Sequence, residues 1–144
     1  MVRMLSRAAS RFWLMAPAFA ALTLQGAVAQ ERDRADVPDQ YKWDLTAIYP
    51  SNDAWRSAKT RIEAGLPELK RFEGRLGSSA TVLADAMDAI YGAQKELYRA
   101  YGYASLLADQ DTREASSEAM RQEMVQIAAA FGAQVAYVEP EILG

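Results

Sequence analysis

Histidine and cysteine are both missing from this chain of 144 residues. A catalytic zinc ion nearly always takes at least one imidazole ligand, and a structural zinc ion takes cysteine or histidine. The helical motif His-Glu-x-x-His of zinc peptidases therefore cannot form in this chain. Serine or cysteine nucleophiles activated by histidine are excluded by the same count. A disulfide framework is excluded as well, so packed apolar surface alone must stabilise the fold.

Positive charge is also scarce, because the chain has 16 basic and 19 acidic side chains. Three of the arginines lie in the first 29 residues, which leaves 13 basic and 19 acidic side chains, a net charge of −6, in the remainder. No basic cluster is interleaved with aromatic residues, and the overall negative field repels a phosphate backbone. We therefore expect no nucleic-acid partner.

The first 29 residues have the pattern of a secretory signal peptide. No acidic residue precedes position 31, and the basic residues of this region are Arg3, Arg7 and Arg11. An apolar stretch at residues 12–24 leads to the small residues Ala27 and Ala29, which predict cleavage before Gln30 and export to the periplasm or the medium. Contact with the membrane is then transient. The alternative is an uncleaved anchor, but this stretch is shorter than the roughly 20 residues that span a bilayer.

Residues 30–40 are polar and charged, which predicts a flexible leader. The next segment, residues 41–50, has large apolar side chains but fits no regular element. We expect this segment to be held against one specific surface. The remaining residues belong to an amino-terminal helical domain that we place at residues 41–144.

Three long amphipathic helices are predicted in this domain. Ser51 or Asn52 can cap the first helix, and Pro67 should kink or break it near Gly65. Its apolar stripe consists of Trp55, Ala58, Ile62, Leu66, Leu69, Phe72 and Leu76. Gly74 and Gly77 should end this helix, and Ser78 and Ser79 should cap the next one.

The second and third helices have the same three-and-four spacing of apolar residues. The second stripe consists of Leu83, Ala86, Ile90, Ala93, Leu97, Ala100, Ala104 and Leu107. The third helix should begin near Thr112, with Glu114 in its first turn, and run through Val138 to end before Pro140. The chain shows no strand pattern, so the predicted fold is all-α, an antiparallel bundle of about three long helices.

Three glycines, Gly92, Gly102 and Gly132, lie inside the predicted helices. A glycine in a helix interior costs about 1 kcal/mol relative to alanine. We expect close approach of neighbouring helices to compensate for this cost. The alternative is a ligand groove lined by exposed backbone.

A group of acidic residues begins at Asp109 and Asp111. A calcium loop of the helix-loop-helix kind needs glycine at its sixth position and glutamate at its twelfth. Counted from Asp109, these positions hold Glu114 and Met120. The pattern favours a polar turn and a helix cap at Asp111 or Thr112 over a calcium site.

Glu114 and Glu118 are one helical turn apart and could form an acid and base pair, but without an apolar pocket they favour a solvated helix face. A group of tyrosines comprises Tyr91, Tyr98, Tyr101 and Tyr103. Tyr91 and Tyr98 flank the second stripe, which favours the edge of a core or a domain interface over contact with a peptide substrate. No catalytic, cofactor-binding or metal residue is predicted in the chain.

Six segments, in this order, resemble the amino-terminal region of oligoendopeptidase F, a zinc metallopeptidase of the thimet-oligopeptidase-like family. They are residues 41–50, 53–55, 72–76, 101–106, 109–112 and 139–142. The resemblance implies a mostly helical enzyme that cleaves short unstructured peptides inside a channel. Its zinc ligands and catalytic glutamate are implied to lie in a carboxyl-terminal domain beyond the equivalent of Gly144, so no active-site residue can be transferred to this chain.

The resemblance implies that this chain is one wall or lid of the channel, inactive alone, with its own catalytic domain as partner. We therefore expect a fragment or a truncated gene product. Zinc is expected in the full-length enzyme and not on this chain. The predicted export signal distinguishes this chain from many proteins of the family it resembles, which are cytoplasmic. The alternative is a stand-alone exported helical module that binds a partner protein through its apolar faces.

Overall fold

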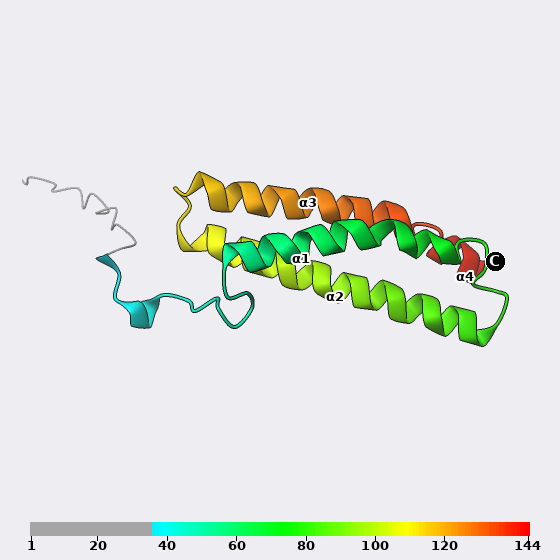
Figure 1. Cartoon of the computed structure of the whole chain (residues 1–144). Helices are drawn as coiled ribbons and strands as arrows, with labels where there is room; N and C mark the ends of the chain where they lie inside the picture. Colours follow the sequence, from blue (N-terminus) through cyan, green and yellow to red (C-terminus); the bar gives the residue numbers. More distant parts are fainter. Residues whose placement is uncertain (1–35) are drawn as a thin grey trace, which may run out of the picture. The chain divides into compact units, whose positions relative to one another are not determined.

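The computed structural model describes residues 36–144, so the predicted signal peptide and the first part of the leader lie outside the described residues. Three long helices pack against one another: α1 (Asn52–Gly65), α2 (Ala80–Gln110) and α3 (Ala115–Val135) (Figure 1). Shorter elements are the 3-10 helices η2 (Asp39–Tyr41) and η3 (Leu66–Phe72), and the short helix α4 (Val138–Leu143). Every regular element between residues 36 and 144 is helical, which confirms the all-α prediction.

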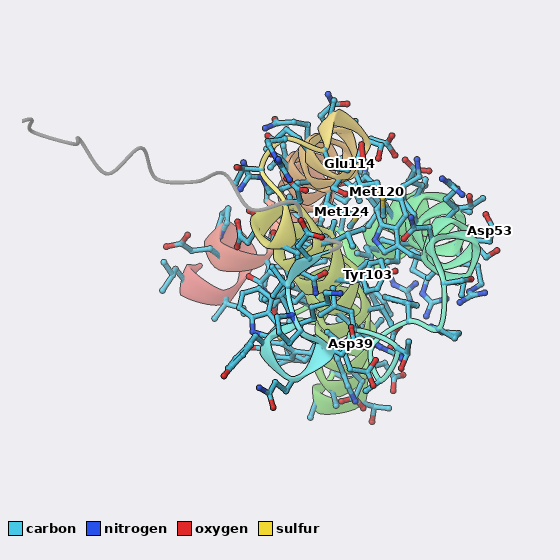
Figure 2. The ribbon with its side chains drawn as sticks, turned by 90° about the vertical axis from the view of Figure 1, so that its left-hand side faces the viewer. Asp39, Asp53, Tyr103, Glu114, Met120 and Met124 are labelled. Atoms are coloured by element: carbon cyan, nitrogen blue, oxygen red, sulfur yellow. The ribbon has the colours of Figure 1, made fainter. Side chains whose placement is uncertain are left out.

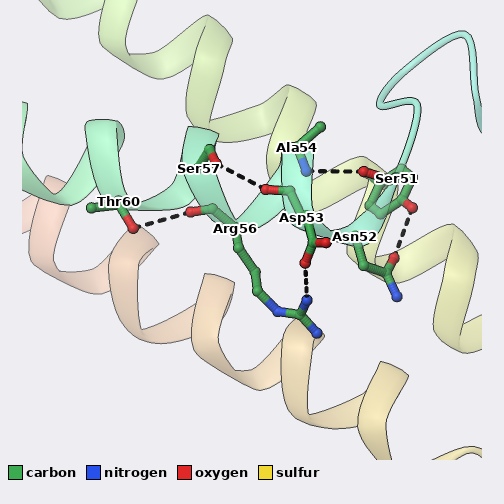
Figure 3. A network of polar contacts seen from close by, with 8 residues as sticks. Ser51, Asn52, Asp53, Ala54, Arg56, Ser57 and Thr60 are labelled. Atoms are coloured by element: carbon green, nitrogen blue, oxygen red, sulfur yellow. Dashed lines mark hydrogen bonds and ion pairs between the residues drawn. The ribbon is translucent and has the colours of Figure 1, made fainter.

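The start of α1 is capped as the sequence predicts. The Ser51 hydroxyl accepts a hydrogen bond from the backbone N–H of Ala54 at 3.2 Å, which satisfies one of the unpaired donors of the first turn (Figure 3). Asp53 adds a negative charge at the positive end of the helix dipole and pairs with Arg56 at 2.6 Å. Two further side chains, Ser57 and Thr60, donate to backbone carbonyls one turn earlier.

The predicted break near Gly65 is a change of helix type. The α-helical hydrogen bonds end there, and a 3-10 helix begins at Leu66, one residue before Pro67. Proline has no N–H and clashes with the carbonyl four residues earlier, so the chain changes its winding at this point. The apolar stripe continues across the break, because Leu66, Leu69 and Phe72 are all buried.

The turn between η3 and α2 also follows the prediction. Gly74 has a φ of 74°, a left-handed conformation that other residues rarely adopt. The Ser79 hydroxyl then caps α2 by accepting from the Val82 N–H at 3.1 Å. The buried face of α2 consists of Ala86, Ile90, Leu97, Ala100, Tyr103, Ala104 and Ala108.

The predicted start of the third helix is wrong by about one turn. Asp111 and Thr112 do not cap α3, because α2 extends through Gln110 and Asp111 ends it. The helix α3 begins at Ala115, so Glu114 is the residue before the helix and not part of its first turn. The side chain of Asp111 instead accepts from the backbone N–H of Arg113 at 3.0 Å, which closes the turn.

The predicted end of the third helix is also wrong. α3 ends at Val135, and Val138 and Pro140 belong to the separate helix α4. A proline in the first turn of a helix loses no hydrogen bond, because the N–H groups there have no partner within the helix. Pro140 therefore fits inside the start of α4 and does not stop helical structure.

The expected close approach at the helical glycines is absent. A Cβ atom added to Gly92, Gly102 or Gly132 would meet no atom within 4 Å. The packing of the described residues therefore does not offset the cost of these glycines.

Among residues 36–144, no helix combines the length and apolar character that crossing a bilayer requires.

Replacing Gly92 by alanine should raise the free energy of unfolding of this chain by about 0.5–1 kcal/mol. The reason is that alanine restricts the unfolded chain and fits the helix without a clash. Urea denaturation followed by circular dichroism measures the change. The matched control is Gly74→Ala, which should destabilise because its φ of 74° disfavours a side chain. Equal effects of the two substitutions would contradict this account.

Candidate functional site

The segment of residues 41–50 is held against the helices by its second half. Tyr49 is buried, and Leu45 and Ile48 pack against the same apolar cluster. The first half is different, because the side chains of Tyr41 and Trp43 are mostly exposed. The backbone of the first half is nevertheless tied to α2, because the Gln110 side chain donates to the Trp43 carbonyl at 3.0 Å. The expectation that this segment is fixed to one surface is therefore confirmed for the side chains of its second half and for the backbone at Trp43.

Arg99 of α2 is the main polar anchor of this segment. Its guanidinium donates to the backbone carbonyl of Ile48 at 2.6 Å and lies 4.8 Å from the centre of the Tyr49 ring. The Tyr49 ring in turn meets the Tyr103 ring edge to face, with centres 5.5 Å apart. One arginine thus satisfies a carbonyl and holds an aromatic pair in place.

Tyr103 connects the segment to the start of α1. Its hydroxyl donates to the Asn52 side-chain oxygen at 2.8 Å, and burial raises the pKa of this phenol. Figure 2 shows Tyr103 on α2 where the amino-terminal segment and α1 come together. One turn of α2 earlier, the Trp55 indole N–H donates to the Ala100 carbonyl at 2.9 Å. Tyr103 is therefore a buried structural residue and not a surface for peptides.

A second polar clamp ties α4 to the turn after η3. The Glu141 carboxylate accepts hydrogen bonds from the backbone N–H groups of Gly74 and Leu76. Nearby, the buried Tyr137 hydroxyl donates to the Leu69 carbonyl at 2.7 Å, and burial raises its pKa. These contacts join two of the segments that carry the family resemblance, residues 72–76 and 139–142.

The acidic residues considered for calcium or for catalysis meet at the turn between α2 and α3. Asp109, Asp111, Glu114 and Glu118 line a hollow of about 220 Å³. Arginines also belong to this region: Arg113 pairs with Asp111 at 2.9 Å, and Arg121 approaches Glu118 at 2.7 Å and Asp109 at 3.8 Å. The arrangement is a salt-bridged turn.

Glu118 does not have the character of a general acid. Hydrogen bonds from Gln122 and then from Arg121 hold the pKa of its carboxyl below the ordinary value. A general acid needs the opposite shift, produced by an apolar pocket. Glu114 lies before α3 and makes no capping hydrogen bond with its side chain.

Two grooves lie between α1 and α3, on either side of an ion pair. Lys59 and Glu123 approach to 2.6 Å across the two helices, and this hydrogen bond raises the pKa of the Lys59 amine. The larger groove, of about 500 Å³, has Leu66, Pro67 and Ile127 among its lining residues. Sequence reasoning missed this feature because Lys59 and Glu123 are 64 residues apart, which no local pattern connects.

Comparison with known proteins identifies relatives by sequence. The chain is similar to the plasmid-encoded oligoendopeptidase F of Lactococcus lactis subsp. cremoris, with 32% identity over 113 residues, which are 78% of this chain and 19% of that protein. It is also similar to oligopeptidase PepF of Bacillus subtilis, with 30% identity over 111 residues, 77% of this chain and 17% of the relative.

A third relative is group B oligopeptidase PepB of Streptococcus agalactiae, with 26% identity over 111 residues, 77% of this chain and 18% of that protein. The chain thus spans about a fifth of the length of the relatives it matches. No family model and no solved structure matches it.

Zinc is the metal that this resemblance implies, and the side chains present do not fit it. The sequence contains no histidine and no cysteine. Among residues 36–144, no group of three acidic side chains is arranged to hold a metal ion. Asp111 and Glu118, at the turn after α2, are paired with arginines, which compete with a cation for the same oxygens. No step of a zinc mechanism can be assigned to these residues.

Replacing Arg99 by methionine should release residues 45–49 from the helices. The variant loses a charged hydrogen bond to Ile48 and the contact with Tyr49, which together contribute about 1 kcal/mol. Hydrogen exchange at the Ile48 and Tyr49 amides should become faster while the centre of α2 stays protected. Lys95→Met, an exposed position one turn earlier on α2, is the control. Unchanged exchange in Arg99→Met would show that Arg99 is not the anchor.

Proposed function

Because this chain is homologous to part of oligoendopeptidase F, we propose that it is the amino-terminal helical portion of a zinc metalloendopeptidase that hydrolyses short, unstructured peptides. The observation that carries this proposal is the similarity over 113 residues to an enzyme named for this activity. The helical content of residues 36–144 agrees with the mostly helical enzyme that the resemblance implies.

The role of this portion is structural: it forms one wall or lid of the channel that admits extended peptides. The metal and the reacting groups come from residues outside this chain, since the chain lacks imidazole and thiolate ligands. What this chain supplies is rigidity. Its segments are fixed by buried hydrogen bonds from Trp55 and Tyr137 and by a partly buried one from Tyr103.

The division of labour can be tested with two proteins, this chain and the full-length enzyme. The full-length enzyme should contain a His-Glu-x-x-His helix and should hydrolyse a quenched fluorescent peptide, with activity lost to a chelator and restored by one equivalent of zinc. This chain alone should neither hydrolyse the peptide nor bind zinc stoichiometrically. Chelator-sensitive hydrolysis by the purified chain would overturn the proposal.

We further propose that the protein is exported. The support is the basic start, the apolar stretch at residues 12–24 and the small residues Ala27 and Ala29. Mass spectrometry of the protein from its native host should find an amino terminus at Gln30, in the periplasm or the medium. A protein that keeps residues 1–29 and fractionates with membranes would instead indicate an uncleaved anchor.

The second candidate is a stand-alone exported module that binds a partner protein. The observation that favours it is the exposure of Tyr91 and Tyr98 on α2, which are 64% and 62% exposed. The two candidates differ in the gene product. If the chain is a stand-alone module, the native host makes from this locus no zinc-dependent peptidase that is longer than this chain.

A further inference from the structure

The pair of helices α2 and α3 is covered on one side by α1. The Trp55 indole reaches the Ala100 carbonyl of α2, and Lys59 pairs with Glu123 of α3. A hollow of about 240 Å³ between α1 and α2 is lined by Ile62 of α1 and by Gly92 and other residues of α2. The residues of α2 and α3 that meet α1 therefore define one side of the pair.

Three tyrosines lie on the other side of the pair. Tyr91, Tyr98 and Tyr101 are separated by seven and three residues, so they form one row along α2. At 100° per residue this row is almost opposite the positions of α2 that face α1. Arg121 of α3 lies near Tyr101, so the row borders α3.

The adjoining part of α3 is also apolar and exposed. Val125 lies one turn after Arg121 and is 45% exposed. The outward residues that follow it are small: Ala129, Gly132, Ala133 and Ala136. No charged residue occurs between Glu123 and Glu139, whereas the exposed faces of α1 and α2 carry several. We call this surface, formed by the tyrosine row and by Val125, Ala129, Ala133 and Ala136, the open face.

Two helical glycines border the open face. Gly102 is one turn after Tyr98, and Gly132 is two turns after Val125. Neither is approached within 4 Å of an added Cβ, so nothing in the described part of the chain offsets the cost of a glycine inside a helix. Glycine in a helix allows another helix backbone to come close. The pairing of glycines with exposed tyrosines therefore points to an occupant outside the described residues.

We propose that the open face is the docking surface for an amphipathic helix from the part of the same enzyme that this chain does not contain, an inference that rests on the proposed function. About four fifths of each relative lies outside the matched segment, so such a helix is available in cis. A helix placed between α2 and α3 opposite α1 would complete a four-helix arrangement. Its apolar stripe would cover the tyrosine rings and Val125.

The position of α4 supports this choice of occupant. Seen along the bundle in Figure 2, α1 and α4 lie on opposite sides of α2. The side chains of Ile142 and Leu143 on α4 are exposed, at 55% and 78%. The helix that carries these exposed residues thus lies on the side of α2 away from α1, as the open face does. A single docked element could cover both.

Photocrosslinking in the full-length enzyme tests the proposal directly. Tyr98→p-benzoylphenylalanine should form an intramolecular crosslink, mapped by mass spectrometry to a peptide outside the segment matched here. Tyr41→p-benzoylphenylalanine is the matched control, because Tyr41 is similarly exposed but lies in the amino-terminal segment. Crosslinks from position 98 only to a second copy of the enzyme, or only to an added substrate peptide, would overturn the proposal.

A pair of lysine substitutions gives an independent measurement. In this chain alone, Tyr91→Lys with Tyr98→Lys should leave the unfolding temperature unchanged, because both side chains are exposed. In the full-length enzyme the same pair should lower it by about 3 °C or more, because two charges are then buried in an interface. No difference between the two proteins, or a higher KM with unchanged stability, would contradict docking at this face.

These outcomes separate the two proposals. If the full-length enzyme is a zinc-dependent peptidase but the lysine pair has no effect on its stability, the open face is not the interface and the proposed function stands. If the native host makes no zinc-dependent peptidase from this locus, the proposed function fails first. In that case crosslinking from position 98 in the cell would identify a separate partner.

Discussion

The hydrogen bond from the Trp55 indole to the Ala100 carbonyl fixes the relation between α1 and α2, on which the other contacts depend. The indole is almost completely buried, and its N–H would be costly to bury without an acceptor. Ala100 and Ala104 are fully buried small residues on α2 that leave room for the ring. With α1 held in this register, Asn52 comes within reach of the Tyr103 hydroxyl and the chain before it lies against Arg99.

Local rules predicted the elements that depend on local chemistry. The cap at Ser51, the change of winding before Pro67 and the left-handed turn at Gly74 all follow from residues adjacent in sequence. The boundaries of α3 were not predicted correctly. The Asp111 side chain accepts from the Arg113 N–H within the turn and does not cap α3, and Pro140 is compatible with the first turn of α4. The anchor at Arg99 could not be predicted from local rules either, because Arg99 is 51 residues from its acceptor, the Ile48 carbonyl.

The segments that carry the family resemblance are brought together in pairs by the fold. Residues 101–106 supply Tyr103, which meets the end of the 41–50 segment and the start of α1. Glu141, from residues 139–142, accepts from the backbone of Gly74 and Leu76 in residues 72–76. Both pairs are clamps between distant parts of the chain. The residues that carry the resemblance therefore include those that hold the helices and their connecting segments together. The acidic turn at Asp109 to Glu118 is held by arginines.

The change from α-helix to 3-10 helix after α1 sets the combined length of α1 and η3 along the bundle. An α-helix advances about 1.5 Å per residue and a 3-10 helix about 2.0 Å. The seven residues of η3 therefore extend about 14 Å instead of about 10 Å. The 3-10 winding that begins next to Pro67 thus lengthens the stretch formed by α1 and η3 by roughly the rise of two α-helical residues. This length sets where along the bundle the antiparallel helix α2 begins.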